Sequence, residues 1–170
     1  FTSPHLYDLK HRFWLKDKFV TLKELKKNIN TIEKLKIKLT LFELLTLVYY
    51  ISASKLKNIS YSLVEAGLLF SKDSTRVWNY PKCQIITNIN KQHLDWVKPK
   101  TLKSICKEKV GYLSRKTNIY IGKQDKKTLK IIKKILKENP SNKFYYGKDW
   151  TLKKFNKKII FKVKHGKLIL

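Results

Sequence analysis

The stretch PKCQIITNI, residues 81–89, decides the fold class of this chain. Its run Cys83–Ile89 is short, apolar and rich in β-branched residues, and it follows a proline, which is typical of a buried strand. A helix is predicted after it over Thr101–Lys109, ending at Gly111. Short apolar strands that alternate with helices predict an α/β fold, with a mainly parallel central sheet flanked by helices.

The same pattern continues on both sides of this stretch. Thr21, followed three residues later by Glu24, is a capping box that opens a helix. The expected helices cover residues 21–35, 40–52 and 125–137. The expected strands are the end of one at 1–6, a short hairpin over 11–20, and runs at 59–64, 118–121, 144–146, 158–163 and 168–170.

The composition fits a folded domain with a strongly basic surface. The chain has 170 residues, of which 42% are apolar, and 39 Lys and Arg against 12 Asp and Glu give a net charge of +27. Only three of the basic residues are arginine, the residue that phosphate and base recognition favours, and the lysines are scattered. We therefore expect a solvated lysine surface and no specific nucleic-acid partner, although a basic nucleic-acid-binding module stays open as an alternative.

Several other classes of protein are excluded. The most apolar stretch, Leu39–Ile51, carries an acid and is too short to span a bilayer, and the first ten residues do not form a signal peptide. Cys83 and Cys106 form neither a disulfide framework nor a metal-binding spacing. We expect a cytoplasmic protein without a membrane partner. Because the chain starts at Phe1 and contains no methionine, we also expect it to be a piece of a longer protein.

Polar side chains follow three of the predicted strands. Ser3, Glu65 and His93 supply a hydroxyl, a carboxylate and an imidazole, and ligands of open α/β sheets bind beyond the carboxyl ends of strands. These three could line one cation site. Taken alone, Glu65 is more simply explained as the partner of a surface lysine, and His93 as an ordinary surface residue. No G-x-S-x-G elbow and no glycine-rich phosphate loop occurs.

Five motifs at these residues resemble those of the folylpolyglutamate synthases and bifunctional dihydrofolate synthases of the Mur ligase superfamily. Their order and spacing agree over about residues 2–150. The motifs are SPHL at 3–6, LTLFE at 39–43, EAGL at 65–68 with DST at 73–75, ITNI at 86–89 with His93, and EKVG at 108–111.

The resemblance implies an ATP-dependent ligase that joins L-glutamate to dihydropteroate or to folylpolyglutamates through an acyl phosphate, with ATP and Mg²⁺ as cofactors. Residues 1–150 would be the central portion of its P-loop-type ATPase domain, and residues 151–170 the start of a short β segment of the same domain. The phosphate loop would precede residue 1, and the carboxy-terminal domain would follow residue 170. The fragment alone would be inactive, its partners small molecules, and the protein a monomer.

The resemblance also assigns roles to single residues. Ser3 and Glu65 would bind one Mg²⁺ and His93 a second, while Lys109 matches a lysine that the family carries as a carbamate. His93 and Lys109 are thus the catalytic candidates. The substrate-binding candidates are Thr40, Phe42, Asp73 and Ser74. By pattern alone, Phe42 is a core residue and Lys109 a surface lysine.

Two further alternatives stay open. The segments TNI at 87–89 and HLD at 93–95 also bear some likeness to Mur ligases that act on peptidoglycan precursors. A diverged, non-catalytic paralogue is the other, since Leu69 and Phe70 replace two family glycines and Gln92 replaces an aspartate.

Overall fold

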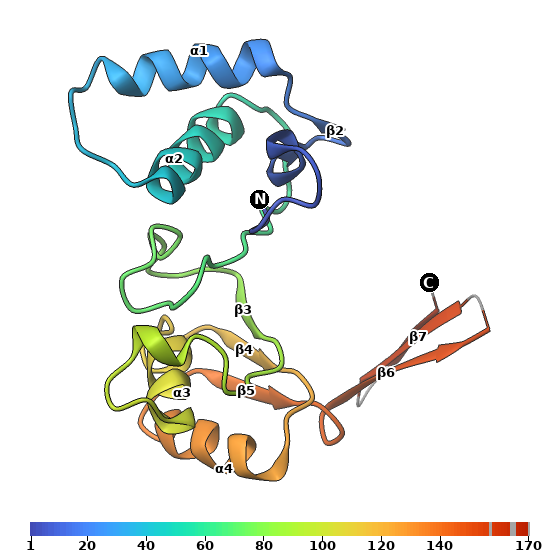
Figure 1. Cartoon of the computed structure of the whole chain (residues 1–170). Coiled ribbons are helices and arrows are strands. Elements are labelled where there is room, and N and C mark those ends of the chain that lie inside the picture. Colours follow the sequence, from blue (N-terminus) through green and yellow to red (C-terminus); the bar gives the residue numbers. More distant parts are fainter. Residues whose placement is uncertain (157, 164–165, 170) are drawn as a thin grey trace. The chain divides into compact units, whose positions relative to one another are not determined.

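The computed structural model describes residues 1–156, 158–163 and 166–169. The chain divides into two compact units, Phe1–Val77 and Trp78–Leu170. Figure 1 shows the course of the chain, with labels on most of the helices and strands. None of the described helices combines the length and the apolar character that crossing a lipid bilayer requires.

The first unit contains two α-helices, a short 3-10 helix and a small hairpin. The 3-10 helix η1 (Leu9–Arg12) is followed by the antiparallel pair β1 (Trp14–Leu15) and β2 (Lys18–Phe19), and then by α1 (Leu22–Glu33) and α2 (Leu41–Ser54). The predicted hairpin and both predicted helices are confirmed. The core of this unit consists of Phe1, Phe13, Val20, Leu25, Ile32, Leu45, Val48 and Tyr49.

Both helices begin at a complete capping box. The Thr21 side chain accepts a hydrogen bond from the backbone N–H of Glu24, and the Glu24 carboxylate accepts one in return from the Thr21 N–H. Thr40 and Glu43 make the same exchange at the start of α2. Each box satisfies backbone donors that the first turn of a helix leaves unpaired, which is why both helices begin where they do.

The second unit is built on a parallel sheet of three strands in the order β3-β4-β5. Helices α3 and α4 contact each other and lie on one face of this sheet, as right-handed crossovers between neighbouring parallel strands require (Figure 1). The fold class is therefore the predicted one. In chain order the elements are β3 (Cys83–Ile86), the 3-10 helix η2 (Leu94–Trp96), α3 (Leu102–Val110), β4 (Asn118–Ile121), α4 (Lys126–Ile135) and β5 (Asn142–Tyr145).

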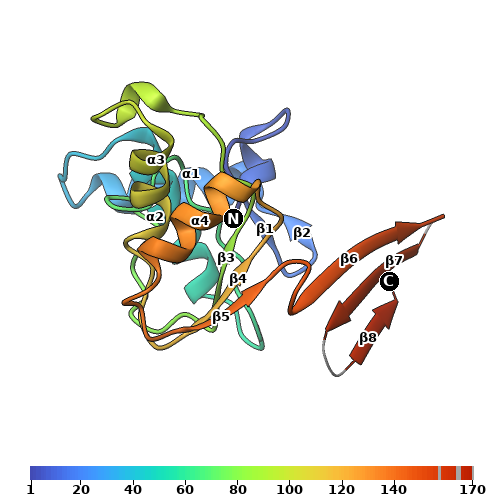
Figure 2. The same cartoon turned by 90° about the horizontal axis from the view of Figure 1, so that it is seen from below.

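A second, antiparallel sheet follows the parallel one (Figure 2). It contains β6 (Trp150–Phe155), β7 (Lys158–Val163) and β8 (Gly166–Ile169) in that order. The strand predicted over 158–163 is confirmed. Strand β6 was not predicted, and the last residue of the strand expected over 168–170 lies outside the described residues.

Two predicted strands of the first unit are wrong. Residues 1–6 and 59–64 form no strand, and Leu63 keeps 79% of its surface exposed where a buried run was expected. One step of parallel pairing remains, because the Phe1 amino group donates to the Leu63 carbonyl at 2.9 Å and the Glu65 N–H donates to the Phe1 carbonyl at 3.0 Å. A single step is too short to form a ladder, so the segment is extended without being a strand.

Strand β3 is shorter than predicted and ends at Ile86. Two of the next three residues bind a side chain instead of a neighbouring strand, since Gln124 donates from Nε2 to the Thr87 carbonyl at 2.7 Å and accepts from the Ile89 N–H at 3.0 Å. Gln124 thereby ends the ladder and holds the loop that leads toward His93.

Candidate functional site

The structure brings together two of the predicted metal ligands, Ser3 and Glu65. The backbone N–H of Ser3 donates to Oε2 of Glu65 at 2.9 Å, and the Thr2 hydroxyl donates to the same oxygen. The pairing of Phe1 with residues 63–65 places both segments side by side. The Glu65 carboxylate is exposed, so a ligand can reach it.

Arg12 adds a positive charge to this cluster. Its Nη1 donates to the Ser3 hydroxyl oxygen at 3.1 Å, and its Nε donates to Nδ1 of His5 at 3.3 Å. Partial burial lowers the pKa of the Arg12 guanidinium, and the nearby Glu65 carboxylate opposes that shift. The cluster therefore presents one carboxylate and one guanidinium around a serine hydroxyl.

The side-chain oxygen atoms of Ser3 and Glu65 are suitable ligands for magnesium. Carboxylate and hydroxyl oxygens are hard ligands, and Mg²⁺ is commonly bound through one or two carboxylates plus phosphate oxygens and water. Among the residues that the structure describes, no group of three or more His, Cys, Asp or Glu side chains could hold a metal ion. A metal at this cluster would therefore complete its shell with water or with the phosphates of a nucleotide.

Three of the four predicted substrate residues meet in a second cluster of the first unit. The ring of Phe42 lies against Gly67, where a Cβ would come within 2.8 Å of two ring atoms. Asp73 accepts a hydrogen bond from the Gly67 N–H at 2.9 Å through one carboxylate oxygen, and bonds from the N–H and hydroxyl of Thr75 through the other. Gly67 thus leaves room for the aromatic ring beside the carboxylate.

The hydroxyl of Ser74 joins this cluster to helix α2. It donates to the Thr46 hydroxyl at 2.9 Å, which in turn donates to the Phe42 carbonyl at 2.7 Å. Thr40, the fourth predicted residue, is exposed and serves as the N-cap of α2. The half-buried Phe42 also packs on Phe1, with ring centroids 6.0 Å apart, so the ring is partly a core residue, as its pattern alone indicated.

His93 and Lys109 lie in the second unit, whereas Ser3 and Glu65 lie in the first. His93 is an exposed residue at the start of η2, with a left-handed backbone at φ 60°. Lys109 is half-buried in the last turn of α3. Their predicted roles as a metal ligand and a carbamate therefore stay predictions.

The residues that depart from the family pattern lie close in sequence to the candidate site residues. Leu69 and Phe70 are half-buried, and Gln92 is exposed next to His93. The Phe70 carbonyl accepts from the Asp73 N–H at 3.5 Å, so the phenylalanine belongs to the loop that Asp73 stabilises.

Sequence reasoning missed the threonines that support these clusters. Thr2 binds Glu65, Thr75 binds Asp73 and Thr46 binds Ser74. For Thr75 a signal was present, because an aspartate two residues before a threonine is typical of an Asx turn. For Thr46, which lies within a helix, only the tertiary structure reveals the contact.

Comparison with known proteins supplies the family. A model of the Mur ligase middle domain matches residues 10–170. Solved structures that match the fold include the apo form of L. casei FPGS, at 17% identity and a TM-score of 0.83, which covers 100% of this chain and 45% of that one. A search of curated protein sequences finds no match.

Two further solved structures match the fold over 99% of this chain. The folylpolyglutamate synthase/dihydrofolate synthase of Yersinia pestis c092, complexed with AMPPNP and Mn ion, is 22% identical, with a TM-score of 0.82 and 40% of its own chain covered. E. coli FolC in complex with ADP is 23% identical, with a TM-score of 0.80 and again 40% covered. The present chain therefore spans less than half the length of the structures that it matches.

Proposed function

Because the chain belongs to the Mur ligase middle-domain family, we propose that it is part of an ATP-dependent ligase that joins L-glutamate to dihydropteroate or to a folate. Residues 1–150 would be the central portion of the ATP-binding domain, and residues 151–170 the start of a short β segment of it. The contact between Ser3 and Glu65 carries the proposal, since two motifs far apart in the sequence meet at 2.9 Å.

The nucleotide side of the reaction would lie at this contact. Glu65 and Ser3 would hold Mg²⁺, which supplies charge neutralisation when a triphosphate and a carboxylate approach each other. The presence of AMPPNP and Mn ion in one matched structure, and of ADP in another, supports a nucleotide and a divalent metal for this chain. Arg12 positions the Ser3 hydroxyl and adds a positive charge that favours anionic substrates.

The pterin side would lie at the cluster of Phe42, Gly67 and Asp73. The Phe42 ring offers an aromatic surface for a planar ring, and the Asp73 carboxylate can accept a hydrogen bond from ring amines. The γ-phosphoryl group of ATP would pass to the substrate carboxylate. The amine of glutamate would then attack the carbonyl carbon, form an amide and release phosphate. His93 would bind a second metal ion, and Lys109, carried as a carbamate, would supply a carboxylate that can stabilise a metal.

Turnover by the whole protein tests this proposal. We expect ATP hydrolysis that needs glutamate, Mg²⁺ and either dihydropteroate or tetrahydrofolate. Glu65→Gln removes the charge that would hold the metal, and both it and His93→Ala should lower turnover by about 100-fold or more, as loss of a group that stabilises transition-state charge does. Glu33→Gln, an exposed acid on α1, is the matched control and should leave turnover unchanged.

Three other results would contradict the metal-site assignment or favour an alternative function. Normal turnover by both Glu65→Gln and His93→Ala would contradict the metal-site assignment. A folded protein that binds ATP but turns over no pterin would favour the diverged paralogue, for which Leu69, Phe70 and Gln92 are the evidence. Turnover with a peptidoglycan precursor would move the protein to that branch of the superfamily.

A further inference from the structure

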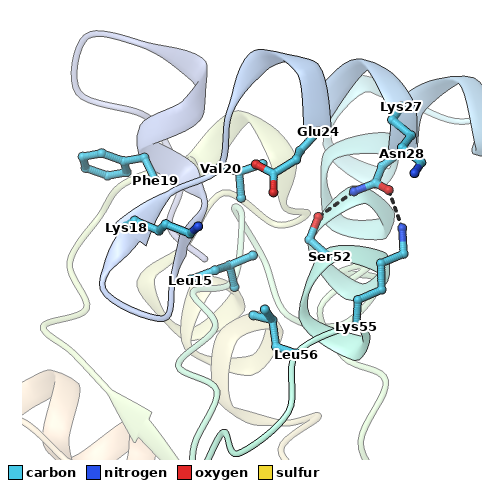
Figure 3. A pocket seen from close by; sticks show the side chains of 10 residues that line it. All are labelled: Leu15, Lys18, Phe19, Val20, Glu24, Lys27, Asn28, Ser52, Lys55 and Leu56. Atoms are coloured by element: carbon cyan, nitrogen blue, oxygen red, sulfur yellow. Dashed lines mark hydrogen bonds between the residues drawn. The ribbon is translucent and has the colours of Figure 1, made fainter.

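A pocket in the first unit has no part in the clusters described above. It has a volume of about 240 Å³ and lies between the β1–β2 hairpin, α1 and the end of α2 (Figure 3). We name it the hairpin pocket. Its apolar wall is formed mainly by Leu15, Val20 and Leu56, while Lys18 on the hairpin and Lys55 after α2 flank it.

The polar side of the hairpin pocket is fixed by a buried asparagine. Asn28 has only 4% of its surface exposed, and its Nδ2 donates to the Ser52 hydroxyl oxygen at 2.8 Å. Its Oδ1 accepts from the Lys55 ammonium at 2.7 Å. Ser52 donates onward to the Val48 carbonyl at 2.7 Å. The chain of bonds from the α2 backbone to Lys55 therefore holds this ammonium at the pocket, with two of its three donors left for other partners.

The charges that line the hairpin pocket are not balanced. Among the described residues that line it, Glu24 is the one acid, against Lys18, Lys27 and Lys55. The Glu24 carboxylate is already bound by the N–H and the hydroxyl of Thr21, at 2.8 and 2.7 Å. The ion pairs found within the described part of the chain involve Lys10 and Lys100, so the charge of Lys55 is opposed by no carboxylate within 4 Å.

We propose that the hairpin pocket binds a small organic carboxylate whose body is one aromatic ring or a short aliphatic chain. The carboxylate accepts hydrogen bonds from Lys55 and is attracted by Lys18, and the apolar body contacts Leu15, Val20 and Leu56. The volume fits this class, since a cavity of about 150 Å³ holds a benzene molecule. An apolar wall beside a few convergent polar groups is the usual composition of a small-molecule site.

Calorimetric titration of the 170-residue chain with benzoate tests the proposal. We expect saturable binding of one benzoate, and binding weaker by about tenfold or more for benzyl alcohol, which has a similar body without the charge. Inorganic phosphate, which has charge but no apolar body, should also bind more weakly than benzoate. Equal binding of benzoate and either analogue, or no saturable binding, would overturn the proposal.

Two substitutions localise the effect. Lys55→Gln keeps a donor for Asn28 but removes the charge, and it should weaken benzoate binding by about tenfold, whereas Lys55→Arg should retain most of it. Lys57→Gln, an exposed lysine two residues away that does not line the pocket, should bind benzoate like the unchanged chain. An equal loss of binding in Lys55→Gln and Lys57→Gln would show a general charge effect and contradict the site.

A further measurement does not depend on any variant folding. In NMR spectra of the unchanged chain, benzoate should shift the methyl signals of Val20 and Leu56 and leave those of Ile119 and Ile132, in the core of the second unit, unmoved. Unchanged signals for Val20 and Leu56 at saturating benzoate would exclude binding in the hairpin pocket.

Discussion

Asp73 stabilises the loop between residues 67 and 75 through both of its carboxylate oxygens. One oxygen accepts from the Gly67 N–H, and the other accepts from the N–H and the hydroxyl of Thr75. The resemblance to the family implied a substrate-binding role for Asp73 and did not predict this structural role. The same side chain therefore shapes the loop that it would use to bind a ligand.

Asp73→Asn should destabilise the first unit. An amide has a single acceptor oxygen, so either Gly67 or Thr75 would face an N–H₂ group, and an unsatisfied partly buried donor costs about 1–3 kcal/mol. The free energy of unfolding, from urea denaturation followed by circular dichroism, measures this loss. Asp17→Asn, at the hairpin turn, is the control and should change it by less than about 0.5 kcal/mol. Equal stability of the two variants would contradict the role of Asp73.

The two cysteines should differ sharply in reactivity. Cys106 lies in the core of the second unit with no exposed surface, and burial raises the pKa of its thiol to about 11, with a smaller contribution from Asp125. Cys83 is exposed. Since the thiolate is the reactive form, a disulfide reagent at pH 8 should label one thiol in the native chain and two in denaturant. Rapid labelling of both in the native chain would show that α3 does not pack as described.

At the scale of elements, the starts of α1 and α2 were predictable because capping is local. A threonine and a glutamate three residues apart satisfy each other's backbone donors whatever the rest of the chain does. Residues 59–64 show the opposite case. An apolar run with strand propensity becomes a strand only where another segment pairs with it, and among the described residues a single backbone hydrogen bond from Phe1 to Leu63 is found along this run.

The capping box of α2 should make stability depend on pH. Hydrogen bonds from the Thr40 N–H, and then from the Thr40 hydroxyl, lower the pKa of Glu43 below its ordinary value of 4.5. A lowered pKa in the folded state means that the stabilisation is present above the unfolded-state value and is lost as the pH falls through the folded-state pKa. We expect the unchanged chain to lose more stability between pH 6 and pH 3 than Glu43→Gln does, measured by urea denaturation at each pH.

Thr40→Ala tests the other half of this box. Loss of an N-cap side chain costs about 1 kcal/mol, and the loss should appear at pH 6 as a lower midpoint of urea denaturation. Thr31→Ala, at an exposed position within α1, is the comparison and should have a smaller effect. No difference between Thr40→Ala and the unchanged chain would show that the cap does not stabilise α2.

At the scale of the whole molecule, charge is the dominant feature. The many positive charges behind a net charge of +27 repel one another, and the ion pairs of Lys10 with Asp8 and of Lys100 with Asp95 offset little of this repulsion. Salt screens such repulsion, so the midpoint of thermal unfolding should rise between 50 mM and 500 mM NaCl. Each 1 kcal/mol gained would raise it by about 2–4 °C. A midpoint that is constant or falls with salt would contradict a stability limited by repulsion.

The sequence by itself determined the α/β class, the helices, the strand at 118–121 and the presence of a strand that begins at Cys83, because periodicity, capping and β-branched residues act over a few neighbours. It also carried the five motifs that resemble the Mur ligases. Only the tertiary structure decided that Ser3 meets Glu65 and that Gln124 ends β3 at Ile86. These contacts join residues tens of positions apart, and a pairing of that range depends on which segments the packed chain places side by side.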